Sequence, residues 1–194
     1  MKLILASASP RRHEILSLAG LEHEIRPSDA DESKIPYTPR HPEEYVTALA
    51  GCKAKAVSVG EDEILLSADT IVYVPETDEI LGKPKDRDDA FRMLSLLSGS
   101  THKVITGVCL ADTSGVLDSF AVVSDVHFRE LSDTEIYSYI DRCKPFDKAG
   151  AYGIQEGACH FVDCITGDYY NIVGLPISPV YTKLRPYLVP NSCV

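Results

Sequence analysis

MKLILASASPRR, at residues 1–12, is the stretch that predicts how the fold begins. The apolar run at residues 3–6 predicts a buried strand, and small residues then predict a turn. Ser9 and Pro10 predict the start of a helix, because serine is a favoured N-cap and proline is well tolerated at the first helical position. The chain therefore begins with a predicted strand, turn and helix.

Arg11 and Arg12 occupy the first turn of this predicted helix. A helix N-terminus carries a partial positive charge, so a cation there is unfavourable by roughly 0.3–1 kcal/mol. An anion between the two side chains would remove that penalty, and phosphate fits because arginines and free N–H groups both bind it. The alternative is that both arginines point into solvent. The residues of this stretch leave the two interpretations open.

Length and composition indicate a soluble globular protein. The chain has 194 residues, of which 44% are hydrophobic and 25% charged, and this favours one domain or two lobes that share a core. No apolar run approaches the ~18 residues of a membrane span, and the N-terminus lacks a signal-peptide layout. The six cysteines form no CxxC pair, which favours free thiols in a reducing compartment. We therefore expect a cytoplasmic protein with no membrane partner.

The charge distribution limits the partners further. The formal net charge is −10, which argues against broad binding to nucleic acid or to an anionic membrane. The acidic excess lies entirely after residue 60, because residues 1–60 hold equal numbers of basic and acidic side chains. A small anionic ligand near the arginine pair is compatible with this distribution.

The remaining elements follow from periodicity and capping residues. Strands are expected at residues 3–6, 63–74, 102–112 and 116–128, with an edge strand and an irregular loop within 21–42. Helices are expected at 11–19, from Pro42 onward, between Asp86 and Gly99, at 132–140, and from Ser178 onward. The apolar faces of the first two helices are expected to be Ile15, Leu16, Leu18 and Ala19, and Tyr45, Leu49, Cys52 and Ala56.

Asp69 interrupts the most apolar of these strands, at residues 63–74. Such a run is expected to be buried on both faces, where an ionised carboxylate costs several kcal/mol unless it is paired, hydrogen-bonded or bound to metal. Catalytic carboxylates commonly sit where a central strand ends at a cleft. Asp69 is therefore the strongest catalytic candidate, although it could instead cap a turn through its own backbone.

Three other features admit two interpretations each, and a fourth, Lys83, is a weak signal when taken alone. Lys53 borders an apolar helix face, so it could contact an anion or extend its ammonium into water. The acidic cluster at residues 29–32 is a solvated loop unless it faces the arginines, where carboxylates opposite phosphate indicate a bridging divalent cation. Lys83 lies in a stiff loop between glycine and proline, and Gln155 could bind the edge of a nucleobase or be polar surface.

No P-loop, GxGxxG, HExxH or GxSxG motif is present in the sequence. Several stretches together nevertheless resemble the Maf family of nucleoside triphosphate pyrophosphatases, over nearly the whole chain and in order. They are SASPRR at 7–12, residues 31–32, 49–50 with 53–54, SADT at 67–70, GKP at 82–84, HKVITGV at 102–108, 147–155, and 168–176. One departure from the family pattern is Ala158-Cys159-His160, where small residues are more usual.

The resemblance implies a fold and an activity. The implied fold is α/β and Maf/ITPase-like: an elongated, two-lobed single domain over residues 1–194, with a mixed twisted sheet flanked by helices and a central cleft, often as a homodimer. The implied activity is hydrolysis of a nucleoside triphosphate to the monophosphate and pyrophosphate, supported by a divalent metal cation, Mg²⁺ or Mn²⁺. A weaker alternative is a phosphatase that releases orthophosphate.

The resemblance also implies roles for individual residues. Asp69 is similar to the family's general base, and Glu32 to a metal-binding acid that works with it. The implied phosphate ligands are Ser7, Arg11, Lys53 and Lys83. The implied specificity residues are Arg12, Thr70 and Gln155, and they fit the dTTP/UTP branch better than the branch that acts on 7-methyl-GTP. A different class of function, a nucleotide-binding regulator of septum formation that acts through a partner, is the alternative.

Overall fold

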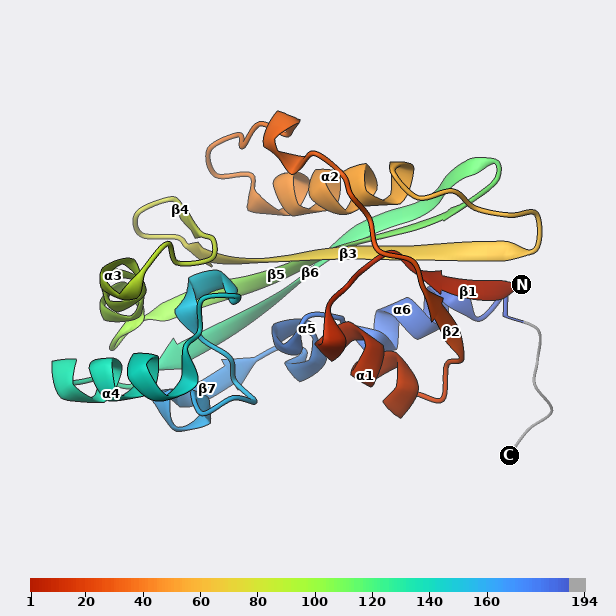
Figure 1. The fold of residues 1–194 in the computed structure, drawn as a ribbon. Helices are drawn as coiled ribbons and strands as arrows, with labels where there is room; N and C mark the ends of the chain where they lie inside the picture. Colours follow the sequence, from red (N-terminus) through yellow and green to blue (C-terminus); the bar gives the residue numbers. More distant parts are fainter. Residues whose placement is uncertain (189–194) are drawn as a thin grey trace. The chain divides into compact units, whose positions relative to one another are not determined.

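The computed structural model describes residues 1–188, and Figure 1 shows their helices and strands. The strands are β1 (Lys2–Leu5), β2 (His23–Ile25), β3 (Glu63–Val74), β4 (Glu79–Leu81), β5 (Thr101–Asp112), β6 (Gly115–Phe128) and β7 (Val162–Thr166). The α-helices are α1 (Pro10–Leu18), α2 (Pro42–Lys55), α3 (Arg87–Leu97), α4 (Asp133–Cys143), α5 (Tyr169–Val173) and α6 (Ile177–Leu184). Three short 3-10 helices are η1 (Glu32–Lys34), η2 (Ala149–Ala151) and η3 (Cys159–Phe161).

The strands form one mixed sheet in the order β2-β1-β3-β5-β6-β7, with β4 paired to β3. β1 is parallel to both β2 and β3, whereas β4 and β7 run antiparallel to their neighbours. The α/β class with a mixed sheet flanked by helices is therefore confirmed. The loop after α1 and the edge strand β2 are also as predicted.

Local signals placed most elements correctly. β3 has the predicted bounds, and nine of its twelve residues are buried. α3 begins after Asp86, whose side chain accepts a hydrogen bond from the Asp89 N–H. The capping box of α4 is present, with Ser132 and Glu135 each bonding the other's backbone N–H. The bounds of these elements thus follow from local periodicity and capping residues.

Three predictions about helices were wrong. In α1, Ile15 and Leu16 are buried, but Leu18 is 73% exposed and Ala19 is also exposed. In α2 the buried face is rotated by about one residue from the predicted one. It comprises Val46, Leu49, Ala50 and Ala54, with Val57 just beyond the helix. α6 begins at Ile177 rather than at Ser178, and its N-cap is Pro176.

The rotation of α2 has a visible cause at Gly107 of β5. A Cβ at Gly107 would come within 2.4 Å of the Val46 carbonyl oxygen, so the helix backbone approaches the sheet where a side chain is missing. The Ser67 hydroxyl of β3 donates to the carbonyl oxygen of Ala50 at 2.7 Å. Small side chains on α2 therefore face the sheet, and Tyr45 does not.

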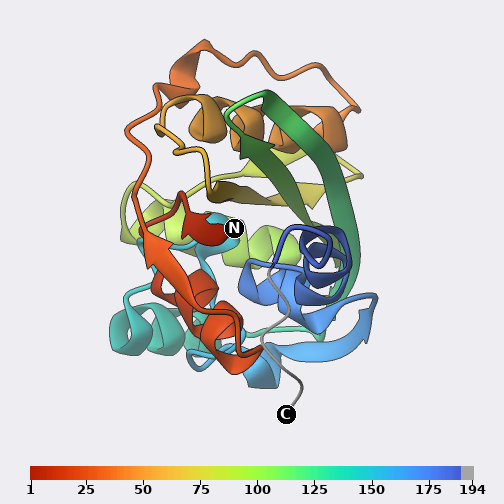
Figure 2. The ribbon, with the colours of Figure 1, turned by 90° about the vertical axis from the view of Figure 1, so that its right-hand side faces the viewer.

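The chain divides into two compact units. Unit 1 comprises residues 1–69, 106–122 and the described part of 174–194, and unit 2 comprises 70–105 and 123–173. Within unit 1, α2 covers one face of the sheet while α1 and α6 cover the other (Figure 1, Figure 2). A buried cluster under α2 joins Ile4, Ala50, Leu65 and Cys109 among others.

Unit 2 is centred on aromatic side chains. Its buried rings include His102, Phe128, Tyr139, Tyr152 and Phe161, and neighbouring rings among these five meet edge to face.

Two further predictions concern the surface and the thiols. Within residues 1–188, none of the helices has the length and apolarity that crossing a membrane demands. The five described cysteines are free thiols, and Cys193 lies outside the described residues.

Candidate active site

Asp69 lies in the middle of β3 and not at its end, where the general pattern of catalytic carboxylates would place it. The pairing of β3 with β1 extends to Leu66 opposite Leu5, and its pairing with β4 begins at Val72. Asp69 falls between these two pairings, and 16% of its side chain is exposed. Because β1 ends before it reaches Asp69 and β4 begins after it, this edge of β3 has no paired strand beside Asp69 within residues 1–188. The gap leaves the carboxylate accessible, as the end of a strand would.

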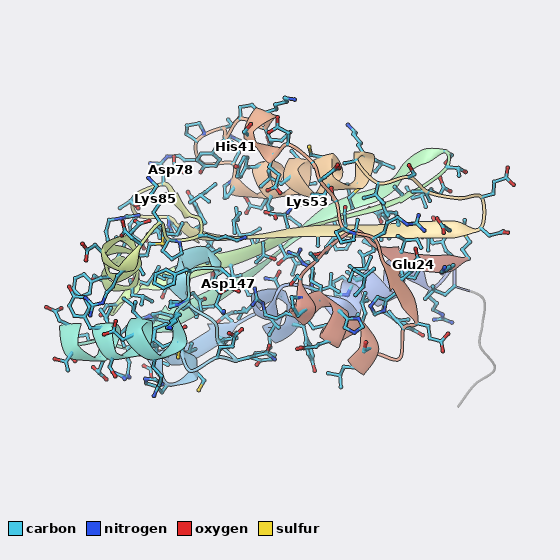
Figure 3. All side chains as sticks on the ribbon, viewed as in Figure 1. Glu24, His41, Lys53, Asp78, Lys85 and Asp147 are labelled. Carbon is cyan, nitrogen blue, oxygen red and sulfur yellow. The ribbon has the colours of Figure 1, made fainter. Side chains whose placement is uncertain are left out.

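Lys53 extends from α2 toward β3 (Figure 3). Its ammonium donates a short hydrogen bond to Asp69 Oδ1 and lies 3.2 Å from Glu32 Oε1. Only 16% of the Lys53 side chain is exposed. The interpretation of Lys53 as a surface lysine is therefore wrong, because its charged end turns inward to two carboxylates.

Glu32 begins the short helix η1, and the neighbouring acid has a different role. Asp31 is the N-cap of η1 and accepts hydrogen bonds from the Ser33 N–H and the Ser33 hydroxyl. These hydrogen bonds, with one from Lys34, hold the pKa of Asp31 below its ordinary value. Because Asp31 is engaged in capping, Glu32 is the member of the acidic cluster that meets Lys53.

Arg12 is buried on the α1 side of unit 1. Its Nε donates to the Gly174 carbonyl oxygen at 2.9 Å, and its Nη1 donates to the Ser7 hydroxyl at 2.9 Å. Burial lowers the pKa of the Arg12 guanidinium, Asp69 opposes this shift, and Arg11 adds to it. Arg11 is half-buried in the same helical turn. The two predicted arginines thus have different environments, and Arg12 joins the 7–12 stretch to the chain near Gly174.

Tyr45 is a residue of this site that the sequence analysis did not identify. It precedes Lys53 by eight residues on α2, a spacing that places both on one helix face. Burial raises the pKa of Tyr45, and the charges of Asp69 and Glu32 raise it further. Its ring meets that of Tyr37 edge to face at 5.5 Å. The spacing from Lys53 was the available signal, but Tyr45 was assigned to the apolar stripe.

The other predicted site residues belong to unit 2. Thr70 follows Asp69 in β3 and, because successive residues of a strand point to opposite faces, its side chain lies on the other face. Lys83 is exposed in the loop after β4. Gln155 is exposed in the segment between α4 and η3. The structure thus brings Glu32, Lys53 and Asp69 together within unit 1, and the charges of Asp69 and Glu32 also act on Tyr45 and Arg12.

The cluster and the mixed sheet define an α/β protein in which a helix lysine and an acid of a short 3-10 helix meet a carboxylate of strand β3. The family model "Maf-like protein" matches residues 2–187. The chain therefore belongs to the Maf family.

Curated relatives are similar to this chain in sequence, and one solved structure is similar to it in fold. The chain is 50% identical to the "dTTP/UTP pyrophosphatase" of Alkaliphilus oremlandii, with 95% of each chain covered. It is 47% identical to the protein of the same name from Thermosipho africanus, with 95% of this chain and 92% of that one covered. The Ham1 protein of Staphylococcus aureus has a similar fold, with a TM-score of 0.53 at 11% identity over 97% of this chain and 100% of that one.

Proposed function

We propose that this protein hydrolyses dTTP and UTP to the nucleoside monophosphate and pyrophosphate. The observation that carries the proposal is the contact of Lys53 with both Asp69 of the central strand and Glu32 of η1. Relatives at 43–50% identity bear the name dTTP/UTP pyrophosphatase, which supports the same reaction and the same substrates. Removal of modified pyrimidine nucleotides would be a related use of the same chemistry.

The reaction needs a base for water and positive charge for the triphosphate. In the proposed step, Asp69 accepts a proton from a water molecule whose oxygen forms the new bond to the α-phosphorus. The bond between the α-phosphorus and the bridging oxygen breaks, and pyrophosphate leaves with its electron pair. Lys53 holds the Asp69 carboxylate by a hydrogen bond and supplies positive charge beside it.

The same residues fit a divalent cation. Asp69 and Glu32 both direct carboxylate oxygens at the Lys53 ammonium, so they already converge on one positive charge. Mg²⁺ in phosphate-transferring sites is commonly held by one or two carboxylates together with substrate phosphates. Within residues 1–188 there is no group of three or more His, Cys, Asp or Glu side chains able to hold a metal by themselves. We therefore propose Asp69 and Glu32 as the protein ligands of Mg²⁺ or Mn²⁺, which would offset the charge on the leaving group.

The remaining roles follow from the resemblance. Ser7, Arg11 and Lys83 are proposed to bind phosphate oxygens, and Arg12, Thr70 and Gln155 to select the base. The Ser7 hydroxyl already accepts a hydrogen bond from Arg12, so it retains its own proton to donate to a phosphate oxygen. The geometry of Ser7 is therefore compatible with the role proposed for it.

A nucleotide panel tests the proposal. Purified protein with Mg²⁺ should release pyrophosphate from dTTP and UTP, and removal of the metal with EDTA should stop the reaction. Glu32→Gln should raise the Mg²⁺ concentration required for half-maximal rate by about tenfold, as expected when one carboxylate ligand loses its charge. Release of orthophosphate instead of pyrophosphate, or no turnover of any triphosphate, would contradict the proposal, and the latter would favour a nucleotide-binding regulator.

A further inference from the structure

Lys148 is a buried lysine in the segment that carries Gln155. Only 7% of its side chain is exposed, against 62% for Asp147 and 46% for Glu156. The Lys148 ammonium lies 2.8 Å from Asp147 Oδ1 and 2.8 Å from Glu156 Oε2. A buried ammonium is costly unless it is paired, so these two contacts tie the beginning of the segment to its end.

The aliphatic stem of Lys148 is fitted to Gly153. A Cβ at Gly153 would come within 2.7 Å of Lys148 Cε and 2.9 Å of Lys148 Cδ. Gly153 has no positive φ, so its backbone conformation does not require glycine. The missing side chain is instead what gives the lysine stem its place beneath the segment.

Other contacts within unit 2 hold the same segment. The Gly153 N–H donates to the Tyr139 hydroxyl at 3.0 Å, and the Tyr152 hydroxyl is 2.8 Å from His102 Nε2. The Glu156 N–H donates to the Gly153 carbonyl oxygen at 2.9 Å. The backbone is thus fixed on both sides of the exposed Gln155.

A fixed backbone matters for an amide that reads a base. Uracil and thymine present a carbonyl oxygen beside an N–H, whereas cytosine presents an amino group beside a ring nitrogen that accepts. A glutamine amide offers one acceptor and two donors, so by rotating half a turn it can pair with either pattern. Discrimination between the two patterns therefore requires that Gln155 approach the base from one fixed direction.

We propose that Lys148 is a positioning residue for base selection: its two ion pairs and its packing on Gly153 hold residues 147–156 so that Gln155 presents its amide in one orientation. This inference rests on the proposed function, because it assigns Lys148 a part in recognising the dTTP and UTP base. Lys148 acts through Gln155.

Lys148→Met tests the inference because it removes the charge and keeps an unbranched stem. The KM for dTTP and UTP should rise by about tenfold, the scale on which misplacing a contact group acts. The kcat should stay within about threefold of wild type, because the residues around Asp69 are untouched. The preference for UTP over CTP should shrink accordingly. Lys144→Met is the matched control, since Lys144 is an exposed lysine four residues earlier, and its KM values should equal those of wild type.

A double-mutant cycle separates positioning from general damage. Gly153→Ala should raise the KM for UTP as Lys148→Met does, because the new Cβ displaces the lysine stem. In a Lys148→Ala background the stem is gone, so Gly153→Ala should add little to the effect of Lys148→Ala alone. Such strong non-additivity is expected for two groups in direct contact. Additive effects would overturn the fitted pair.

Two results would overturn the inference as a whole. One is an active wild type whose Lys148→Met variant keeps its UTP-to-CTP preference, or loses only kcat and thermal stability. The other is unchanged amide hydrogen exchange at Gly153 and Glu156 in Lys148→Met, which would show that Lys148 does not hold the segment. If wild type releases no pyrophosphate from any nucleotide, the proposed function fails by itself and base selection by Lys148 fails with it, while the exchange measurement still decides the anchoring.

Discussion

Two lysines in this protein each lie between two carboxylates, and their surroundings differ. Lys53 in unit 1 pairs with Asp69 and Glu32, which come from β3 and η1, while the lysine itself comes from α2. Lys148 in unit 2 pairs with two acids of its own segment, the furthest eight residues away. The first cluster is built from three separate elements, and the second from one short stretch of chain.

Exposure distinguishes the two clusters more sharply. At Lys53 the partner in the central strand is largely buried, since 16% of the Asp69 side chain is exposed. At Lys148 the lysine is the buried member, and both its acids reach water. A largely buried carboxylate held by a neighbouring cation is suited to chemistry, because its orientation is fixed and its charge is poorly screened. A buried lysine with exposed acids is suited to holding a segment in place.

The largest effect is expected from Asp69→Asn, which should lower the rate of pyrophosphate release from dTTP by about a thousandfold, the scale of losing a general base. The amide keeps the size of the side chain, so circular dichroism and the melting temperature should show a folded protein. A variant that retains more than a tenth of the activity would contradict the role of Asp69 as the general base. The Lys53 cluster would then have no greater part in the chemistry than the Lys148 cluster.

Lys53→Met should have the next largest effect. Removing the ammonium leaves Asp69 and Glu32 without their shared cation, and kcat should fall by about a hundredfold, the scale of losing one stabilising charge. This result contrasts with Lys148→Met, which should act mainly on KM. Steady-state kinetics of both variants with UTP measure this contrast. If Lys53→Met and Lys148→Met had the same effects on kcat and on KM, the difference between the two clusters would be contradicted.

The stability of the protein in mild acid should depend on unit 2. Burial lowers the pKa of His102 from 6.5 to about 3. Below pH 6.5 His102 therefore binds a proton in the unfolded chain but stays neutral in the folded chain. The free energy of unfolding consequently falls by up to about 1.4 kcal/mol per pH unit as the pH decreases from 6.5 toward 3. His102→Gln, which stays neutral, should show a flatter decline in urea unfolding between pH 7.5 and pH 5.

This pH window is chosen to exclude the acids. Hydrogen bonds from Arg26 and from Arg129, respectively, lower the pKa of Glu63 and of Glu135 to about 2. Their contribution to stability is present above about pH 4.5 and is lost only as the pH falls toward 2. Equal slopes for wild type and His102→Gln between pH 7.5 and pH 5 would contradict the burial of a neutral His102.

Asp147→Asn should have the smallest effect. Its side chain is 62% exposed, so water screens its charge and its ion pair with Lys148 contributes little. Lys148 also keeps its contact with Glu156 in this variant. The free energy of unfolding, measured with urea, should therefore change by less than about 1 kcal/mol. A larger loss would mean that the buried ammonium depends on both acids, so that Glu156 alone does not suffice to pair it.

Sequence patterns predicted most of the fold but only part of the site. The bounds of β3, the Asp86 cap and the capping box at Ser132 follow from residues a few positions apart, which is the range over which periodicity and capping act. The burial of a lone carboxylate in an apolar strand singled out Asp69. The contacts around it could not be derived in this way, because Lys53 and Asp69 are sixteen residues apart.

The roles of the other site residues were predicted from the resemblance to a family. The structure shows where these residues lie and does not test their roles. Glu32 and Lys53 were named through the resemblance, and the structure shows them in contact. Tyr45 was taken as core, and neither route indicated that the charges of Asp69 and Glu32 act on its hydroxyl. Its assignment depended on which way α2 faces, and that orientation is set by Gly107 on another strand.

The strand–turn–helix of residues 1–12 shows the same division. The sequence by itself determined that a strand ends and a helix begins there, because those signals are local. Only the tertiary structure decided the surroundings of Arg12, since its guanidinium donates to the carbonyl oxygen of Gly174, 162 residues away. Local elements follow from neighbouring residues, whereas the positions of charged side chains follow from packing between distant segments. The candidate active site is made of such charged side chains.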